Sequence, residues 1–215
     1  APSRALMVPT PSVQRDLEAR GFTNTVAWTR GVDTATFSPG ARDALVNRRP
    51  IFLYVGRVAV EKNIEAFLKI DLPGTKWVVG EGPMRAKLER RYPHVHFAGI
   101  KTPAELARYY RAADVFVFPS LTDTFGLVML EALACGTPVA AFPVLGPIDV
   151  IGDSGAGVLH EDLGIACVQA LDIPREKARG YAEQFSWQAS IDQFVRHLTP
   201  VAARSAAWLL ISTPS

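Results

Sequence analysis

The chain contains only two cysteines, Cys135 and Cys167, and neither belongs to a CxxC pair. A zinc site is therefore not expected, and both thiols are interpreted as small buried apolar groups. No apolar run approaches the roughly 20 residues that a membrane-spanning helix needs. The net charge of +2 is scattered along the chain, so the sequence predicts no basic stripe for nucleic acid.

Several catalytic and nucleotide-binding motifs are missing from the sequence. There is no GxGxxG fingerprint and no GxxxxGK[ST] loop, which argues against dinucleotide and P-loop sites. There is no GxSxG nucleophile elbow. His94 and His96 alternate along an expected strand without a third ligand, so no metal site is predicted. The chain starts at Ala1-Pro-Ser without a signal peptide, and we expect a processed chain or a fragment.

What the sequence does contain is a regular alternation of apolar strands and helices that starts at Pro50. Continuous apolar strands separated by helices are typical of a parallel sheet that is covered on both faces. The sequence therefore predicts an α/β fold with a Rossmann-like, doubly wound parallel sheet. The expected strands are 51–55, 76–79, 94–97, 114–118, 138–142 and 155–159. The expected helices are 64–70, 83–91, 103–111, 125–134, 161–171, 174–184 and 186–199.

The N-terminal residues do not fit this rhythm. A short strand is expected at 6–10, a helix at 12–20 and a further strand at 25–28, followed by a linker rich in Pro, Gly and Ser. This piece is too small to form its own core. We expect residues 1–35 to be the end of a preceding domain with its linker, and residues 36–199 to form the main domain. Residues 200–215 are a tail that is too short and too mixed to span a membrane.

The residues that follow the predicted strands bring glycines and cations to one edge of the sheet, where ligands bind in such folds. Two of these loops are Gly56-Arg57…Lys62 and Gly80-Glu-Gly-Pro83. Backbone N–H groups at helix starts, together with Arg and Lys, favour an anion such as phosphate. Each cation taken alone is more simply a solvated surface charge.

Two acids bracket the loop and helix that follow the strand 114–118. We expect Asp123, with Thr124, to cap the helix, and Glu131 to lie about two turns further on the same face. Glu131 stands in an otherwise apolar helix. A buried, unpaired carboxylate costs several kcal/mol, so Glu131 is expected to have a partner or a ligand.

In this order the motifs resemble a known family. The segments Gly56-Arg57…Lys62, Gly80–Pro83, Phe97-Ala-Gly99 and Asp123-Thr-Phe-Gly-Leu…Glu131-Ala-Leu-Ala-Cys-Gly-Thr-Pro-Val139 are similar to the C-terminal domain of the retaining glycosyltransferases of family 4. The resemblance covers about residues 50–190. It implies the GT-B fold, in which two facing Rossmann-like domains enclose the active site, and this chain would contain mainly the donor-binding half.

The resemblance also implies roles for individual residues. Arg57 and Lys62 match the pair that holds and stabilises the leaving nucleotide diphosphate, and Glu131 matches the acid that binds the ribose hydroxyls. Asp123 matches the acid that contacts the donor sugar, but it stands where the family more often has Glu, which leaves the identity of the sugar open. Ile100 occupies the position that faces the base. The remaining donor-binding positions that the resemblance indicates are Gly56, Gly82, Thr124, Phe125, Gly126 and Leu127.

The implied function is transfer of a hexosyl group, with retention, from a nucleotide sugar to a glycan or lipid acceptor in glycan or glycolipid biosynthesis. No cofactor or metal is expected, in agreement with the missing DxD motif. Further expected partners are an N-terminal domain of the same enzyme and, as peripheral contact, the inner face of a membrane; the expected location is cytoplasmic. Without that domain, we expect nucleotide binding but little transfer. A GT-B sugar epimerase and a non-catalytic nucleotide or sugar-phosphate binding module remain alternatives, and a response-regulator-like domain is disfavoured because Arg57 replaces the expected acids.

Overall fold

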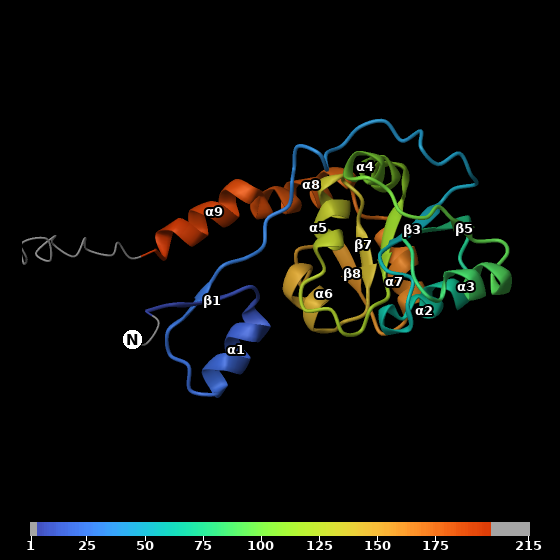
Figure 1. The fold of residues 1–215 in the computed structure, drawn as a ribbon. Coiled ribbons are helices and arrows are strands. Elements are labelled where there is room, and N and C mark those ends of the chain that lie inside the picture. Colours follow the sequence, from blue (N-terminus) through green and yellow to red (C-terminus); the bar gives the residue numbers. More distant parts are fainter. Residues whose placement is uncertain (1–3, 199–215) are drawn as a thin grey trace, which may run out of the picture.

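The computed structural model describes residues 4–198 and contains a six-stranded parallel sheet with helices on both faces (Figure 1). The strand order is β5-β4-β3-β6-β7-β8, and every neighbouring pair is parallel. The predicted doubly wound, Rossmann-like sheet is thus confirmed. The strands are β3 (Ile51–Val55), β4 (Thr75–Val79), β5 (His96–Phe97), β6 (Val115–Phe118), β7 (Val139–Ala141) and β8 (Gly157–Leu159).

Alternate residues of each strand enter two separate cores. Leu53 of β3 packs with Phe116 on one face, whereas Phe52 packs with Phe67 on the other, and all four side chains are fully buried. This explains why the strands have no polar alternation. The first face is covered by α4 (Pro103–Ala112), α5 (Leu127–Ala134), α6 (Leu145–Val150) and α8 (Arg175–Ala182), and the second by α2 (Ile64–Lys69), α3 (Arg85–Arg91) and α7 (Leu163–Ala170).

Local sequence rules explain most of the helix boundaries. The predicted capping box at Thr102 and Glu105 is present, with Pro103 opening α4. The predicted cap of Ser186 on α9 (Trp187–Arg196) is present as well. The helix α6 was not predicted, because Gly146 and Pro147 disrupt its pattern; Pro147 is tolerated since it lies in the first turn. Two short 3₁₀ turns, η1 (Val60–Lys62) and η2 (Glu183–Phe185), complete the elements.

Residues before the linker form a small unit beside the sheet (Figure 1). Its strands β1 (Leu6–Val8) and β2 (Thr25–Ala27) pair in parallel around α1 (Pro11–Ala19), separately from the main sheet. The last helix, α9, runs from the main body toward this unit, where Ser190 Oγ donates to the Thr29 carbonyl at 2.7 Å and Phe194 meets Trp28. The expected domain limits, 1–35 and 36–199, stay a prediction, and the tail at 200–215 lies outside the described residues.

The buried surroundings of both cysteines match their interpretation as apolar core residues. Burial raises the pKa of each thiol to about 12. None of the helices within residues 4–198 has the length and apolar character needed to cross a membrane.

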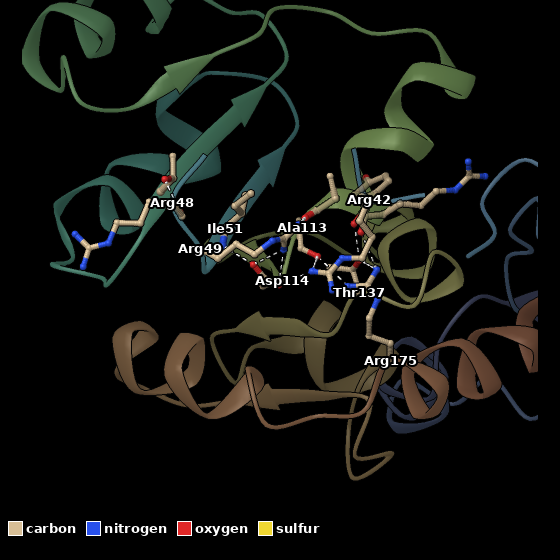
Figure 2. Close-up of polar contacts among 12 residues, drawn as sticks. Arg42, Arg48, Arg49, Ile51, Ala113, Asp114, Thr137 and Arg175 are labelled. Carbon is tan, nitrogen blue, oxygen red and sulfur yellow. Dashed lines mark hydrogen bonds and ion pairs between the residues drawn. The ribbon is translucent and has the colours of Figure 1, made fainter. Parts of the chain in front are cut away.

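Asp114 fixes the amino-terminal edge of the sheet (Figure 2). Its carboxylate accepts the backbone N–H of Ile51 at 2.7 Å and two bonds from Arg49 Nη1 at 2.8 Å, and it also pairs with Arg42. Arg175 stands beside this cluster and donates to the Ala113 carbonyl at 2.9 Å and to Thr137 Oγ1 at 3.0 Å. Burial lowers the pKa of Arg175 to about 10. The starts of β3 and β6 are therefore joined through one carboxylate.

We predict that Asp114→Ala lowers the free energy of unfolding by about 2–4 kcal/mol, because it removes the acceptor of the Ile51 N–H and the carboxylate partner of Arg42 and Arg49. Urea denaturation of the variant and the wild type measures the loss. Asp43→Ala is the matched control, since its pair with Arg108 is exposed at 3.5 Å. It should cost less than about 0.5 kcal/mol. Equal losses for the two variants would contradict the assigned role of Asp114.

Candidate functional site

The order in which the chain adds strands to the sheet reverses between β3 and β6. From β3 the chain proceeds outward to β4 and β5, and it then returns to pair β6 with the other side of β3. At such a switch point the connections leave in opposite directions and a crevice opens at the carboxyl ends of the strands. A cavity of about 350 Å³, here named the main cavity, lies there. Its lining residues are Arg30, Tyr54, Val55, Gly56, Arg57, Lys62, Phe118, Ser120, Asp123, Thr124, Phe125, Gly126, Leu127 and Val128.

A shallower depression of about 250 Å³, here named the side groove, lies beside the main cavity. Val55, Gly56 and Arg57 line both, and the two neighbouring hollows are together named the channel. Ile100, which follows β5, lines the side groove and is 74% exposed. Nine of the eleven predicted site residues thus lie along this channel: Gly56, Arg57, Lys62, Ile100, Asp123, Thr124, Phe125, Gly126 and Leu127.

Gly82 has a different place. A Cβ on Gly82 would lie 2.3 Å from the Val58 carbonyl oxygen, and one on Gly80 would lie 2.0 Å from that of Gly56. These glycines allow the loop after β4 to pack directly on the backbone of the loop after β3. Gly82 lines neither the main cavity nor the side groove. The structure therefore gives Gly82 a packing role, and the expected contact with a ligand stays a prediction.

Lys62 and Asp123 form an ion pair inside the main cavity. Lys62 Nζ lies 2.7 Å from Asp123 Oδ1 and 2.9 Å from Oδ2, and both side chains are largely shielded from solvent. The neighbouring Asn63 adopts a left-handed backbone conformation and donates from Nδ2 to the Pro119 carbonyl at 3.0 Å. This bond connects the loop after β3 with the loop after β6 and brings the two charges together.

The expected capping role of Asp123 and Thr124 is wrong. The helix α5 begins at Leu127, two residues later than predicted, and its N-cap is Gly126 in a left-handed conformation without a side-chain cap. The carboxylate of Asp123 is engaged by Lys62, and a tertiary ion pair has replaced the local hydrogen bond that the sequence suggested. The backbone N–H groups that begin α5 accordingly remain without a side-chain cap at the cavity wall.

Glu131 lies about one turn into α5, whereas Asp123 precedes the helix. Because Asp123 belongs to the loop, the eight-residue spacing does not place the two acids on a common helix face. Glu131 Oε2 accepts a hydrogen bond from the hydroxyl of the buried Tyr110 at 3.0 Å. Burial raises the pKa of Glu131, and the bond from Tyr110 partly opposes this shift. The expected partner of this acid is thus present, but Glu131 does not itself line the main cavity.

Arg57 occupies the mouth of the cavity. Its side chain is 64% exposed and pairs with Glu61 at 3.2 Å, a surface contact that contributes little. Its backbone is better held, because the Tyr54 hydroxyl donates to the Arg57 carbonyl at 2.8 Å. Burial raises the pKa of Tyr54, so the phenol stays a donor. The backbone of Arg57 is therefore held in place, while its exposed guanidinium group is able to change position.

A second cavity adjoins the first, and sequence reasoning missed it. This adjacent cavity, of about 370 Å³, shares the wall formed by Asp123 and Thr124 and extends to α1 and α6. Asp149 Oδ1 accepts from the backbone N–H of Ser12 at 3.1 Å and from its hydroxyl at 2.8 Å, which connects the N-terminal unit to the main body. Seven of its ten lining residues carry a hydroxyl or a carboxylate, and the ten are Thr10, Ser12, Val13, Asp16, Leu121, Thr122, Asp123, Thr124, Leu145 and Asp149.

The chemistry of the channel suits an anionic ligand. Three cations, Arg30, Arg57 and Lys62, line the main cavity together with the start of α5, so positive charge and backbone donors face the same space. The carboxylate of Asp123 lies between the main and adjacent cavities, and it is able to accept hydrogen bonds from the hydroxyl groups of a ligand. Within residues 4–198 no group of three His, Cys, Asp or Glu side chains is arranged to hold a metal ion.

The sequence and fold match known proteins closely. The family model of glycosyl transferases group 1 matches residues 49–172. A GDP-mannose-dependent alpha-mannosyltransferase of Mycobacterium tuberculosis is 36% identical over 71% of this chain and 43% of its own length. One of Mycolicibacterium smegmatis is 33% identical over 92% and 57%, and the sulfoquinovosyl transferase SQD2 of Arabidopsis thaliana is 34% identical over 86% and 42%. The chain spans about half the length of these relatives.

Solved structures agree with the fold. Sucrose-phosphate synthase from Thermosynechococcus elongatus superposes with a TM-score of 0.77 at 27% identity, over 91% of this chain and 57% of that one. Anabaena Alr3699/HepE in complex with UDP superposes with a TM-score of 0.74 over 90% of this chain and 63% of that one, and at 19% identity it supports the fold alone.

The half-buried position of Glu131 predicts a pH-dependent cost in folding free energy. With its pKa raised in the folded state, Glu131 contributes least destabilisation below about pH 4.3, where it is protonated in both states, and its cost grows as pH rises toward the folded pKa. Glu131→Gln removes this cost. We expect the variant to gain stability over the wild type between pH 4 and 8, as measured by urea denaturation across that range. Tyr110→Phe should enlarge the effect by removing the opposing hydrogen bond; a difference independent of pH would contradict the account.

Proposed function

The chain belongs to the group 1 glycosyltransferases, and from this membership and the geometry of the channel we propose that it binds the nucleotide-sugar donor of a hexosyltransferase. The observation that carries the proposal is the main cavity at the switch point, where Arg57, Lys62 and the start of α5 face one space. A diphosphate is the part of such a donor that needs positive charge and backbone N–H donors together.

In this proposal the donor lies along the channel. The diphosphate occupies the main cavity beside Lys62 and Arg57, which also stabilise the charge that develops on the leaving group. The base extends along the side groove toward Ile100. Glu131 binds the ribose through the carboxylate that Tyr110 holds on α5. Because Glu131 does not line the main cavity, the ribose must reach this carboxylate through an opening beside α5. Thr124, Phe125, Gly126 and Leu127 contact the phosphate and sugar through the loop and the start of α5.

The ion pair between Lys62 and Asp123 defines how the donor would enter. An incoming diphosphate competes with Asp123 for the Lys62 ammonium group. Asp123, once released, faces the sugar hydroxyls and accepts hydrogen bonds from them. Because Asp is one methylene shorter than the Glu more common in the family, the sugar must approach the loop more closely than it would for Glu.

The second substrate is proposed to be a glycan or lipid with free hydroxyls. The adjacent cavity supports this, since its hydroxyl and carboxylate lining meets the main cavity at Asp123. Retention of configuration and donor binding without a metal are parts of the proposal that come from the family resemblance, as is the cytoplasmic location. The relatives are about twice as long as this chain, so we propose that transfer also uses residues beyond the 215 given.

The names of the similar proteins do not agree on one nucleotide base. The mannosyltransferases are described as GDP-mannose-dependent, whereas HepE was solved with UDP. The preferred base is therefore to be determined by comparing the binding of UDP, GDP and ADP to this chain.

We predict that Lys62→Ala weakens binding of the preferred nucleoside diphosphate by about 10- to 100-fold, the loss expected when a charged hydrogen-bond donor is removed. Binding of the corresponding nucleoside should change little. Isothermal titration calorimetry with UDP, GDP, ADP and their nucleosides measures both. Lys87→Ala, an exposed lysine on α3, is the control and should leave both affinities unchanged. Equal losses for diphosphate and nucleoside would contradict the phosphate role of Lys62.

Glu131→Ala should produce the complementary pattern. Because the ribose is common to nucleosides and nucleotides, the variant should weaken both by a similar factor of about 5–10, which is the value of about one hydrogen bond. The same titrations measure this. Unchanged nucleoside binding by Glu131→Ala would overturn its assignment to the ribose.

A further inference from the structure

Two buried polar side-chain atoms have no hydrogen-bond partner among the described residues: Ser120 Oγ and Asp149 Oδ2. Ser120 is only 1% exposed, so its hydroxyl is removed from bulk solvent. An unpaired hydroxyl in such a place costs free energy, and buried polar groups of folded proteins are nearly always paired. The hydroxyl of Ser120 is therefore a feature that the fold alone does not account for.

The position of Ser120 explains what could pair with it. Ser120 follows Pro119 directly after β6, at the switch point of the sheet, and it lines the main cavity. The bond from Asn63 Nδ2 to the Pro119 carbonyl ties the residue next to Lys62 to the residue next to Ser120. Ser120 and Lys62 thus line the same cavity from two connected loops.

The surroundings favour a charged partner for this hydroxyl. The buried rings of Phe118 and Phe125 also line the cavity and keep its floor apolar. In such an environment a hydrogen bond to an anion is stronger than it would be in water. The carboxylate nearby, that of Asp123, is engaged by Lys62.

We propose that Ser120 is a further ligand-binding residue of the main cavity, whose hydroxyl donates a hydrogen bond to a diphosphate oxygen of the bound nucleotide. The inference rests on the proposed function and adds a neutral donor to the two cations. It also predicts that substitution of Ser120 affects stability and binding differently from substitution of a purely structural residue. Since the hydroxyl is unpaired without ligand, its removal should not destabilise the protein, although it should weaken binding.

The test compares Ser120→Ala with the wild type in two measurements on the 215-residue chain. Calorimetry with UDP, GDP and ADP should show about tenfold weaker binding of the preferred diphosphate, with nucleoside binding unchanged. Thermal unfolding without ligand should give an equal or higher Tm. Thr137→Val is the matched control, because its buried hydroxyl donates to the Tyr110 carbonyl and accepts from Arg175. It should lower Tm and leave the diphosphate affinity unchanged.

The outcomes separate this inference from the proposed function. If the wild type binds a diphosphate and Lys62→Ala weakens it while Ser120→Ala does not, only the inference on Ser120 is overturned. A lower Tm with unchanged affinity would show that the hydroxyl is paired within the protein. A loss seen with nucleotide sugars but not with diphosphates would place Ser120 on the sugar and overturn the diphosphate contact. Failure of the wild type to bind any diphosphate would overturn both.

Discussion

The pairing of β3 with β6 is the constraint on which the rest of the structure depends. These parallel strands are in register at Phe52–Val115 and Leu53–Phe116, and the chain leaves them in opposite directions. Their amino ends are locked, because the Ile51 and Asp114 residues exchange hydrogen bonds through backbone and carboxylate. Their carboxyl ends diverge into loops that carry Arg57 and Ser120. The amino ends of these strands are thus held together by the arginine–carboxylate bonds of Asp114, while their carboxyl ends border a cavity.

The open edge holds polar groups whose pairing is incomplete or easily exchanged. Lys62 is satisfied by Asp123, yet both charges face a cavity, so an anion could replace the carboxylate without leaving a buried charge unpaired. Among residues 4–198, no group pairs with the Ser120 hydroxyl and no side chain caps the start of α5. A fold selected for stability alone would pair or remove these groups. Their concentration in one place is the physical basis of the proposed donor site.

The N-terminal unit gives the site a second boundary. Ser12 bonds Asp149 across the adjacent cavity, and α9 returns from the end of the main body to meet Trp28 and Thr29. Both connections join segments that are more than 130 residues apart in the chain. The cavity shared at Asp123 is therefore a product of how the two parts meet.

The sequence determined the strand and helix alternation, the parallel sheet and the set of loops at its carboxyl edge, because hydrophobic period and chain-breaking residues act locally. It also determined the cap of α9 at Ser186 and the capping box at Thr102, which depend on residues three apart. The pattern of motifs was sufficient to identify the family. The helix α6 was not predicted because Gly146 and Pro147 usually interrupt helices, although in this helix both lie in the first turn, where proline is tolerated.

Only the tertiary structure decided how the polar side chains pair. Asp123 looked like a cap but bonds Lys62, which is 61 positions away, and Glu131 bonds Tyr110, 21 positions earlier. Gly82 allows two loops to touch, while its expected contact with a ligand stays a prediction, and the sequence does not distinguish the buried Ser120 hydroxyl from that of an exposed loop residue. Hydrogen bonds and ion pairs depend on distances of about 3 Å between atoms that the chain brings together from afar. Such distances are not encoded in the spacing of residues along the sequence.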